Sequence, residues 1–173
     1  LIPNASNLSK IKTHLDKHNV EYLDKSPDTI LIAVQGPQSI SLIKDRFEIP
    51  EKFCTNKTEN LMYARTGYTG EDGVEIMANN NDAESLIQYL IEKGVSPCGL
   101  GSRDTLRLEA SLPLYGFELT EDISPVEASL SWTITNQQDY LGSDKINTQI
   151  SDGIHKSLQK FTIDSRKIAR TDT

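Results

Sequence analysis

Apolar side chains recur at two different spacings along this chain, and the two spacings predict a mixture of helices and strands. Apolar positions three to four residues apart over residues 7–19 predict a first helix. The run TILIAV at residues 29–34 is rich in β-branched residues and is bounded by turn-forming residues, so we expect a buried strand. A second helix is expected after the break at Gly36 and Pro37, with Phe47 on its apolar side. The same criteria predict further strands at residues 60–66, 73–78, 130–135 and 156–163.

The clearest helical pattern in the chain follows the third predicted strand. Asn81 is placed to cap this helix, Glu84 takes the reciprocal capping-box position, and Gly94 is placed to end it. We expect the helix to pack on the core, and we assign it no chemistry. A shorter helix is expected to begin at Gly101 or Ser102. The apolar stripe of the first of these helices consists of Ala83, Leu86, Ile87, Leu90 and Ile91.

The interleaving of short helices and strands predicts a mixed α+β fold. The hairpin-like spacing around residues 60–78 favours largely antiparallel sheets with helices packed on them. Strict alternation of strand and helix, which is typical of a parallel sheet, is not sustained.

A glycine-rich loop separates two of the predicted strands. Its sequence, ARTGYTGEDGVEI at residues 64–76, places Gly67, Gly70 and Gly73 three residues apart. Glycine is used where the backbone takes a positive φ or approaches another group closely, so this density favours a shaped binding loop. A glycine-rich turn with solvated acids is the alternative, and spacing alone does not separate the two. The acidic and aromatic residues of the loop are Tyr68, Glu71, Asp72 and Glu75.

Two arginines lie four residues apart on the expected short helix. Arg103 and Arg107 therefore share one helix face. A pair of guanidinium groups can clamp a carboxylate, because each presents a planar fork of donors that matches carboxylate geometry. The alternative is a solvated ladder with Asp104 and Glu109, and the residues by themselves favour this alternative.

Composition restricts the class of protein and its partners. Of the 173 residues, 36% are apolar and 25% are charged, which is typical of a folded globular chain. The net charge of −7 argues against nucleic acid as a partner. No apolar run approaches the ~18 residues of a membrane-spanning helix, so we expect no membrane insertion.

Cysteine and histidine usage argues against a metal site. The two cysteines lie in different segments, and no CxxC pattern is present. His14 and His18 lie four residues apart but have no further ligands nearby in the sequence, so we interpret them as part of a solvated face. The low cysteine content favours a reducing compartment, which we take to be the cytoplasm.

Five blocks of sequence resemble one family, the aminomethyltransferase or T-protein of the glycine cleavage system. They occur in the order typical of the family and cover most of residues 3–145. The blocks are NAS at residues 4–6, AVQGP at 33–37, RTGYTGEDGVEI at 65–76, CGLGSRDTLRLEASLPLYG at 98–116 and SPVEASLSW at 124–132.

This resemblance implies a reaction and a folate site. The family transfers the methylene carbon of an aminomethyl group from the lipoylated H-protein to tetrahydrofolate and releases ammonia. Glu75 is then expected to bind the pterin ring and Tyr68 to frame it, while Asn4 lines the same cavity. Arg103 and Arg107 are both candidates for contact with folate, and the sequence does not separate them. No metal is implied.

The resemblance also implies a division of the chain. Residues 1–139 correspond to a partial folate-binding domain, 140–155 to a linker helix, and 156–173 to the start of a C-terminal barrel domain. The expected fold is thus the folate-binding aminomethyltransferase-like fold, truncated at both ends. The family's catalytic aspartate precedes the NAS block, so we expect it upstream of Leu1 and expect this chain alone to be inactive.

Two other functions remain as alternatives. One is the folate-binding portion of a sarcosine- or dimethylglycine-type dehydrogenase. The other is a non-catalytic folate-binding relative, such as an iron–sulfur cluster assembly factor of the same fold. That group carries a cysteine-containing loop of KGCYxGQE type, whereas the cysteines of this chain lie in PEKFCTN and SPCGL. A eukaryotic source would change the expected compartment from the cytoplasm to the mitochondrial matrix.

Overall fold

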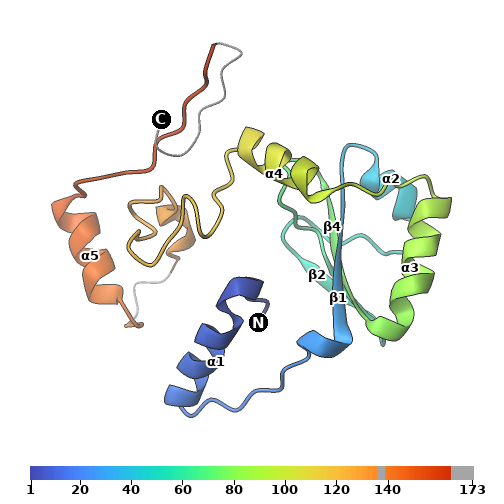
Figure 1. Ribbon diagram of the computed structural model, residues 1–173, viewed down its shortest axis with the longest axis horizontal. Coiled ribbons are helices and arrows are strands. Elements are labelled where there is room, and N and C mark those ends of the chain that lie inside the picture. The colour runs from blue at the N-terminus through green and yellow to red at the C-terminus, as the bar shows by residue number, and fades with distance from the viewer. Residues whose placement is uncertain (136–138, 165–173) are drawn as a thin grey trace. The chain divides into compact units, whose positions relative to one another are not determined.

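The chain divides into two compact units in the computed structural model, which describes residues 1–135 and 139–164. The units are Leu1–Leu112 and Pro113–Thr173, the second described as far as residue 164. Figure 1 shows the elements of each unit. The domain boundaries expected at residues 139 and 155 remain a prediction.

A four-stranded antiparallel sheet forms the centre of the first unit. Its strand order is β1-β4-β3-β2, and each neighbouring pair is antiparallel. The prediction of an antiparallel α+β fold is thereby confirmed. The strands are β1 (Thr29–Gln35), β2 (Thr55–Lys57), β3 (Leu61–Ala64) and β4 (Gly73–Asn79).

Two details of the sheet differ from the sequence-based expectation. Strand β1 is an edge strand of the described sheet, so it is only partly buried, and Leu31 remains 50% exposed. Strand β2 was not predicted, because its sequence TNK is short and polar and carries no alternating pattern.

Helices α2 and α3 bury one face of the sheet (Figure 1). Side chains alternate between the two faces of a strand, so Val74, Ile76 and Ala78 of β4 lie in the core while Glu75 points to the opposite face. The helices contribute Ile43, Leu86 and Leu90 to the same core, together with Phe47 and Tyr63. The helices of this unit are α1 (Leu8–Lys17), α2 (Ser39–Ile43), α3 (Asn80–Glu92) and α4 (Leu100–Glu109), with short 3₁₀ turns η1 (Ala5–Asn7) and η2 (Ser26–Asp28).

The residues that cap the N-termini of α3 and α4 differ from those predicted. Asn79, rather than Asn81, caps α3 by accepting a hydrogen bond from the Asp82 N–H at 3.0 Å, because strand β4 runs directly into the helix. Gly94 ends α3 as predicted, with φ at +85°. The N-cap of α4 is Gly99, earlier than the predicted Gly101 or Ser102, and no side chain caps it.

The second unit contains turns where a strand was predicted at residues 130–135. Residues Ser131–Thr133 form the 3₁₀ turn η3, in which the Thr133 N–H donates to the Leu130 carbonyl at 2.9 Å. The predicted strand is therefore wrong, because the backbone donors are satisfied locally. Trp132 is 77% exposed, as a side chain on a surface turn would be.

The strand predicted at residues 156–163 is also wrong. This segment has no ladder in the described part of the chain, and it is tied to residues 127–129 at one position only. The Leu158 N–H donates to the Glu127 carbonyl at 2.7 Å. The helix expected within residues 140–155 is present as α5 (Ser143–Asp152), bounded by two glycines with positive φ.

A polar cluster joins α3 to the segment that follows α2. The Tyr89 hydroxyl donates to Asp45 Oδ1 at 2.8 Å, and the Lys93 ammonium group pairs with the same carboxylate. The Arg46 guanidinium lies 4.7 Å from the centre of the Tyr89 ring. Burial raises the pKa of Tyr89 to about 12, with Asp45 adding to the effect.

We predict that Tyr89→Phe lowers the free energy of unfolding by about 0.5 kcal/mol, the low end for a hydrogen bond because the pair is partly exposed. A tyrosine whose pKa is raised on folding stabilises the protein below the unfolded pKa near 10 and loses that contribution as pH rises towards 12. The difference between the wild type and Tyr89→Phe in urea unfolding should therefore shrink above pH 10. A difference that stays constant from pH 8 to 11.5 would contradict this account.

Candidate functional site

A cavity of about 560 Å³ lies along edge strand β1 in the first unit. Four successive β1 residues, 32–35, line it, so the cavity follows the open edge of the strand rather than one face of the sheet. The other walls come from the glycine-rich loop, strand β4, helix α3, the connection at residues 95–99 and helix α4. Its volume falls in the range of small-molecule sites.

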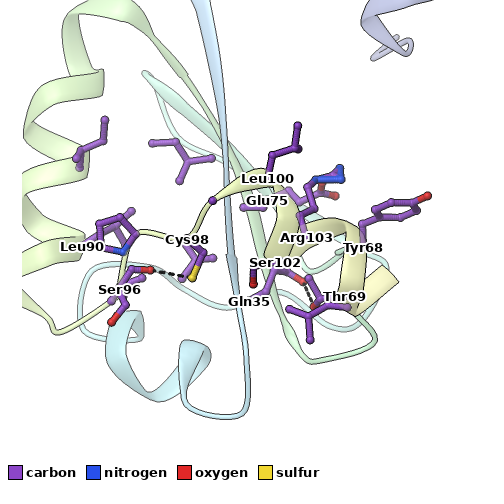
Figure 2. Close-up of a pocket in the computed structure, with 18 of the residues that line it drawn as sticks. Gln35, Tyr68, Thr69, Glu75, Leu90, Ser96, Cys98, Leu100, Ser102 and Arg103 are labelled. Carbon is purple, nitrogen blue, oxygen red and sulfur yellow. Dashed lines mark hydrogen bonds between the residues drawn. The ribbon is translucent and has the colours of Figure 1, made fainter. Parts of the chain in front are cut away.

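The lining separates into an apolar part and a polar part. Helix α3 and the connection that follows it supply Leu90 and Cys98, whereas Tyr68, Glu75 and Arg103 supply an aromatic ring, an acid and a base. Figure 2 shows these three polar or aromatic side chains together at one end of the view and Leu90 and Cys98 at the other. An apolar cavity with a few convergent polar groups is the usual form of a small-molecule site. The remaining apolar residues of the lining are Ile32, Ala33, Val34, Ile87, Ile91, Val95, Pro97, Leu100 and Leu106.

Strand register brings Glu75 to the cavity. Glu75 pairs with Ala33 of β1 and Ala64 of β3, whose small side chains leave room beside the carboxylate. The Thr66 hydroxyl donates to Glu75 Oε2 at 2.6 Å. The other oxygen, Oε1, accepts no hydrogen bond from the described residues. Glu75 is thus oriented by one protein donor and keeps one oxygen for a ligand.

Tyr68 and Arg103 form a cation–π pair across the cavity wall. The Arg103 guanidinium carbon lies 4.6 Å from the centre of the Tyr68 ring. The loop that carries Tyr68 also packs closely against α4. Gly70 takes a φ of +79°, and a Cβ there would lie 2.7 Å from the Cβ of Ala110. Only glycine therefore allows the loop to approach the helix this closely.

Asp72 braces the glycine-rich loop and does not line the cavity. Its carboxylate accepts from both Nε and Nη2 of Arg65, at 3.1 and 2.6 Å. Its carbonyl accepts from the Gly36 N–H and the Ser39 hydroxyl, each at 2.9 Å. The Arg65 guanidinium holds the pKa of Asp72 below its usual value. These bonds agree with a turn-shaping role for this acid.

Arg107 and Asn4 are not among the residues that line the described cavity. Arg107 is only 6% exposed, and its Nε donates to Asp104 Oδ1 at 2.7 Å and its Nη1 to the Leu112 carbonyl at 3.4 Å. Asn4 caps the η1 turn by accepting from the Ser6 N–H at 3.0 Å. Of the five expected site residues, the described cavity brings together Tyr68, Glu75 and Arg103.

Five polar lining residues were missed by sequence reasoning. They are Gln35, Thr69, Ser96, Cys98 and Ser102, and no spacing argument identified them as site residues. Of these residues, Gln35 is the one that the sequence could have revealed, because its polar side chain ends an apolar strand directly before the Gly36 turn.

Neither a metal-binding group nor a membrane-spanning helix is found among the residues that the structure describes. No group of three or more His, Cys, Asp or Glu side chains in that part of the chain is arranged to hold a metal ion. No helix there has the length and apolar character needed to cross a membrane.

The antiparallel sheet and its packed helices define an α+β domain that carries a cavity of small-molecule size. Residues 2–138 match the family model described as the GCVT N-terminal domain. The chain belongs to this family, which confirms the resemblance found in the five sequence blocks.

Relatives that are similar in sequence agree with this assignment. The chain is 40% identical to an aminomethyltransferase of Prochlorococcus marinus over 92% of its own length and 47% of that protein. It is 41% identical to the aminomethyltransferase of Synechococcus elongatus, over 98% of the chain and 49% of the relative. The chain therefore spans about half the length of these relatives.

A solved structure shares the fold. The crystal structure of glycine cleavage system aminomethyltransferase T from Bartonella henselae superimposes with a TM-score of 0.77 and 28% sequence identity. The match covers 87% of this chain and 45% of that protein. The expected aminomethyltransferase-like fold is thereby confirmed.

The two arginines of α4 should respond differently to truncation. Arg107→Ala is expected to lower the free energy of unfolding by about 1–3 kcal/mol, because a buried guanidinium that bonds two groups is lost. Arg103→Ala should cost only about 0.5 kcal/mol, the value of an exposed cation–π contact. Urea unfolding followed by circular dichroism measures both, and equal losses would contradict the assignment of Arg107 as a structural brace.

Proposed function

We propose that the complete protein containing this chain is an aminomethyltransferase of the glycine cleavage system. It transfers the methylene carbon from the aminomethyl-lipoyl H-protein to tetrahydrofolate and releases ammonia. The relatives named above support the reaction class. The observation that carries the proposal is the convergence of Glu75, Tyr68 and Arg103 on one cavity.

The chemistry of these groups fits tetrahydrofolate. The pterin ring presents an amino group and a neighbouring N–H as parallel donors, which a carboxylate such as Glu75 accepts. Tyr68 offers an aromatic edge or face to the ring system, and the apolar wall of the cavity suits the benzoyl part of the molecule. Arg103 matches a carboxylate of the folate tail, because its guanidinium is a planar fork of donors.

In this proposal the chain binds and orients the acceptor of the one-carbon unit. Glu75 fixes the pterin through its donor edge, and Arg103 fixes the tail, so the ring is held in one orientation. The catalytic aspartate of the family is expected outside this chain, and we assign no proton transfer to the residues described. The lipoylated H-protein is the expected protein partner, and the cytoplasm or mitochondrial matrix remains the predicted compartment.

Arg107 receives a different role from the one expected, whereas Asn4 keeps its predicted role. The buried, bonded guanidinium of Arg107 supports α4 and so helps to hold Arg103 in place. Asn4 remains a predicted cavity residue, since its described contacts are confined to the η1 turn.

A direct assay tests the reaction. The complete protein, supplied with H-protein that carries the aminomethyl group and with tetrahydrofolate, should release ammonia rapidly. Ammonia release that does not depend on tetrahydrofolate would refute the transferase proposal. Activity with sarcosine or dimethylglycine in place of the loaded H-protein would instead favour the dehydrogenase-type alternative.

Truncation of the acid tests the site. Glu75→Ala in the complete protein should weaken tetrahydrofolate binding by about 1.5–3 kcal/mol, the usual range for a hydrogen bond to a charged group. Isothermal titration calorimetry measures this affinity. Glu71→Ala is the matched control, because Glu71 lies in the same loop but is exposed and outside the cavity lining. If both variants bind with wild-type affinity, the folate pocket lies elsewhere.

A further inference from the structure

Gln35 lies where strand β1 ends and the glycine-rich loop closes. It pairs with Gly73, the first residue of β4, and its side chain lines the candidate cavity. Figure 2 shows its side-chain amide beside Thr69 of the loop. The proposed function gives this residue no part.

The side-chain amide of Gln35 connects both legs of the loop. Its Nε2 donates to the Thr66 carbonyl at 3.1 Å on the entering leg and to the Val74 carbonyl at 3.2 Å on the leaving leg. Its Oε1 accepts from the Thr69 hydroxyl at 3.4 Å, near the tip. One amide group thus contacts three loop positions that are separated by only eight residues in the sequence.

Two loop glycines provide the space for this side chain. A Cβ on Gly67 would lie 1.7 Å from Gln35 Oε1, closer than any non-bonded contact allows. A Cβ on Gly73 would lie 2.8 Å from Gln35 Nε2 and also 2.2 Å from the Val34 carbonyl oxygen. Gly67 and Gly73 therefore leave the room that the side chain of Gln35 occupies within the loop.

We propose that Gln35 is a positioning residue that directs Tyr68 and Glu75 into the folate cavity, an inference that rests on the proposed function. Its path to Glu75 runs through Thr66, whose carbonyl is held by Gln35 and whose hydroxyl donates to the Glu75 carboxylate. Its path to Tyr68 runs through the two flanking residues, Gly67 and Thr69, which both adjoin the glutamine amide.

The amide group is required by the chemistry of its partners. Nε2 faces two carbonyl oxygens, which need a donor. A carboxylate at this position has no proton to donate and would place negative charge beside two acceptors. Gln35→Glu should therefore weaken folate binding more than Gln35→Ala, although glutamate has nearly the same size as glutamine.

A double-mutant cycle tests the proposal in the complete protein. Gln35→Ala should weaken tetrahydrofolate binding about tenfold, equivalent to the loss of a small hydrogen-bond network. Gly67→Ala should have a similar effect in the wild type, because the new methyl group displaces the glutamine amide. In the Gln35→Ala background the same change should have almost no further effect. Gly101→Ala is the control, because a Cβ there meets no atom within 4 Å.

Kinetics separate positioning from general damage to the structure. The KM for tetrahydrofolate should rise in Gln35→Ala, while the KM for the loaded H-protein and the kcat stay within about twofold of the wild type. The proposal would be overturned if the KM for tetrahydrofolate, the KM for the loaded H-protein and the kcat all worsened by the same factor. Losses from Gln35→Ala and Gly67→Ala that simply multiply in the double variant would overturn it too.

Amide hydrogen exchange provides a readout that needs no ligand. Exchange across residues 66–74 should accelerate to the same extent in Gln35→Ala, Gly67→Ala and the double variant. Unchanged exchange in Gln35→Ala would overturn the proposal even if folate binds. If the wild-type protein fails to bind tetrahydrofolate, the proposed function is refuted, and this experiment still decides whether Gln35 holds the loop.

Discussion

The register between β1 and β4 is the constraint on which the rest of the first unit depends. It pairs Val34 with Val74 in the core and Ala33 with Glu75 on the opposite face. Because side chains alternate along a strand, a slip of β4 by one residue would turn Glu75 towards the core and Val74 away from it. The same register sets Gln35 opposite Gly73, so core, acid and loop are fixed together. The hydrophobic core thereby determines where the proposed folate acid lies.

Sequence reasoning succeeded where local pattern and tertiary packing agree. The alternating residues of β4 and the apolar stripe of α3 both face one core, so their elements were predicted with small errors at the ends. It failed at residues 130–135 and 156–163, where apolar runs suggested strands. A strand requires a partner along its length, and these segments instead bond within turns or at a single backbone position. Periodicity gives no information on the presence of that partner.

The site was predictable only in part, for a related reason. Glu75, Tyr68 and Arg103 followed from family resemblance, and the structure gathers them around one cavity. Gln35 was missed because its hydrogen-bond partners Thr66 and Val74 lie 31 and 39 residues away in the sequence. The glycines were noticed, but the group that they accommodate could not be identified from their spacing. Such a role depends on contacts between distant segments.

The two arginines of α4 illustrate how identical side chains at helical spacing acquire different functions. Arg107 is buried and donates to Asp104 and Leu112, so its donors are engaged by the protein itself. Arg103 is exposed and held against the face of Tyr68. A cation–π contact restrains the guanidinium without using its N–H groups, which donate to no partner among the described residues. A side chain restrained in this way loses less entropy when it binds a carboxylate, so Arg103 is the arginine suited to ligand contact.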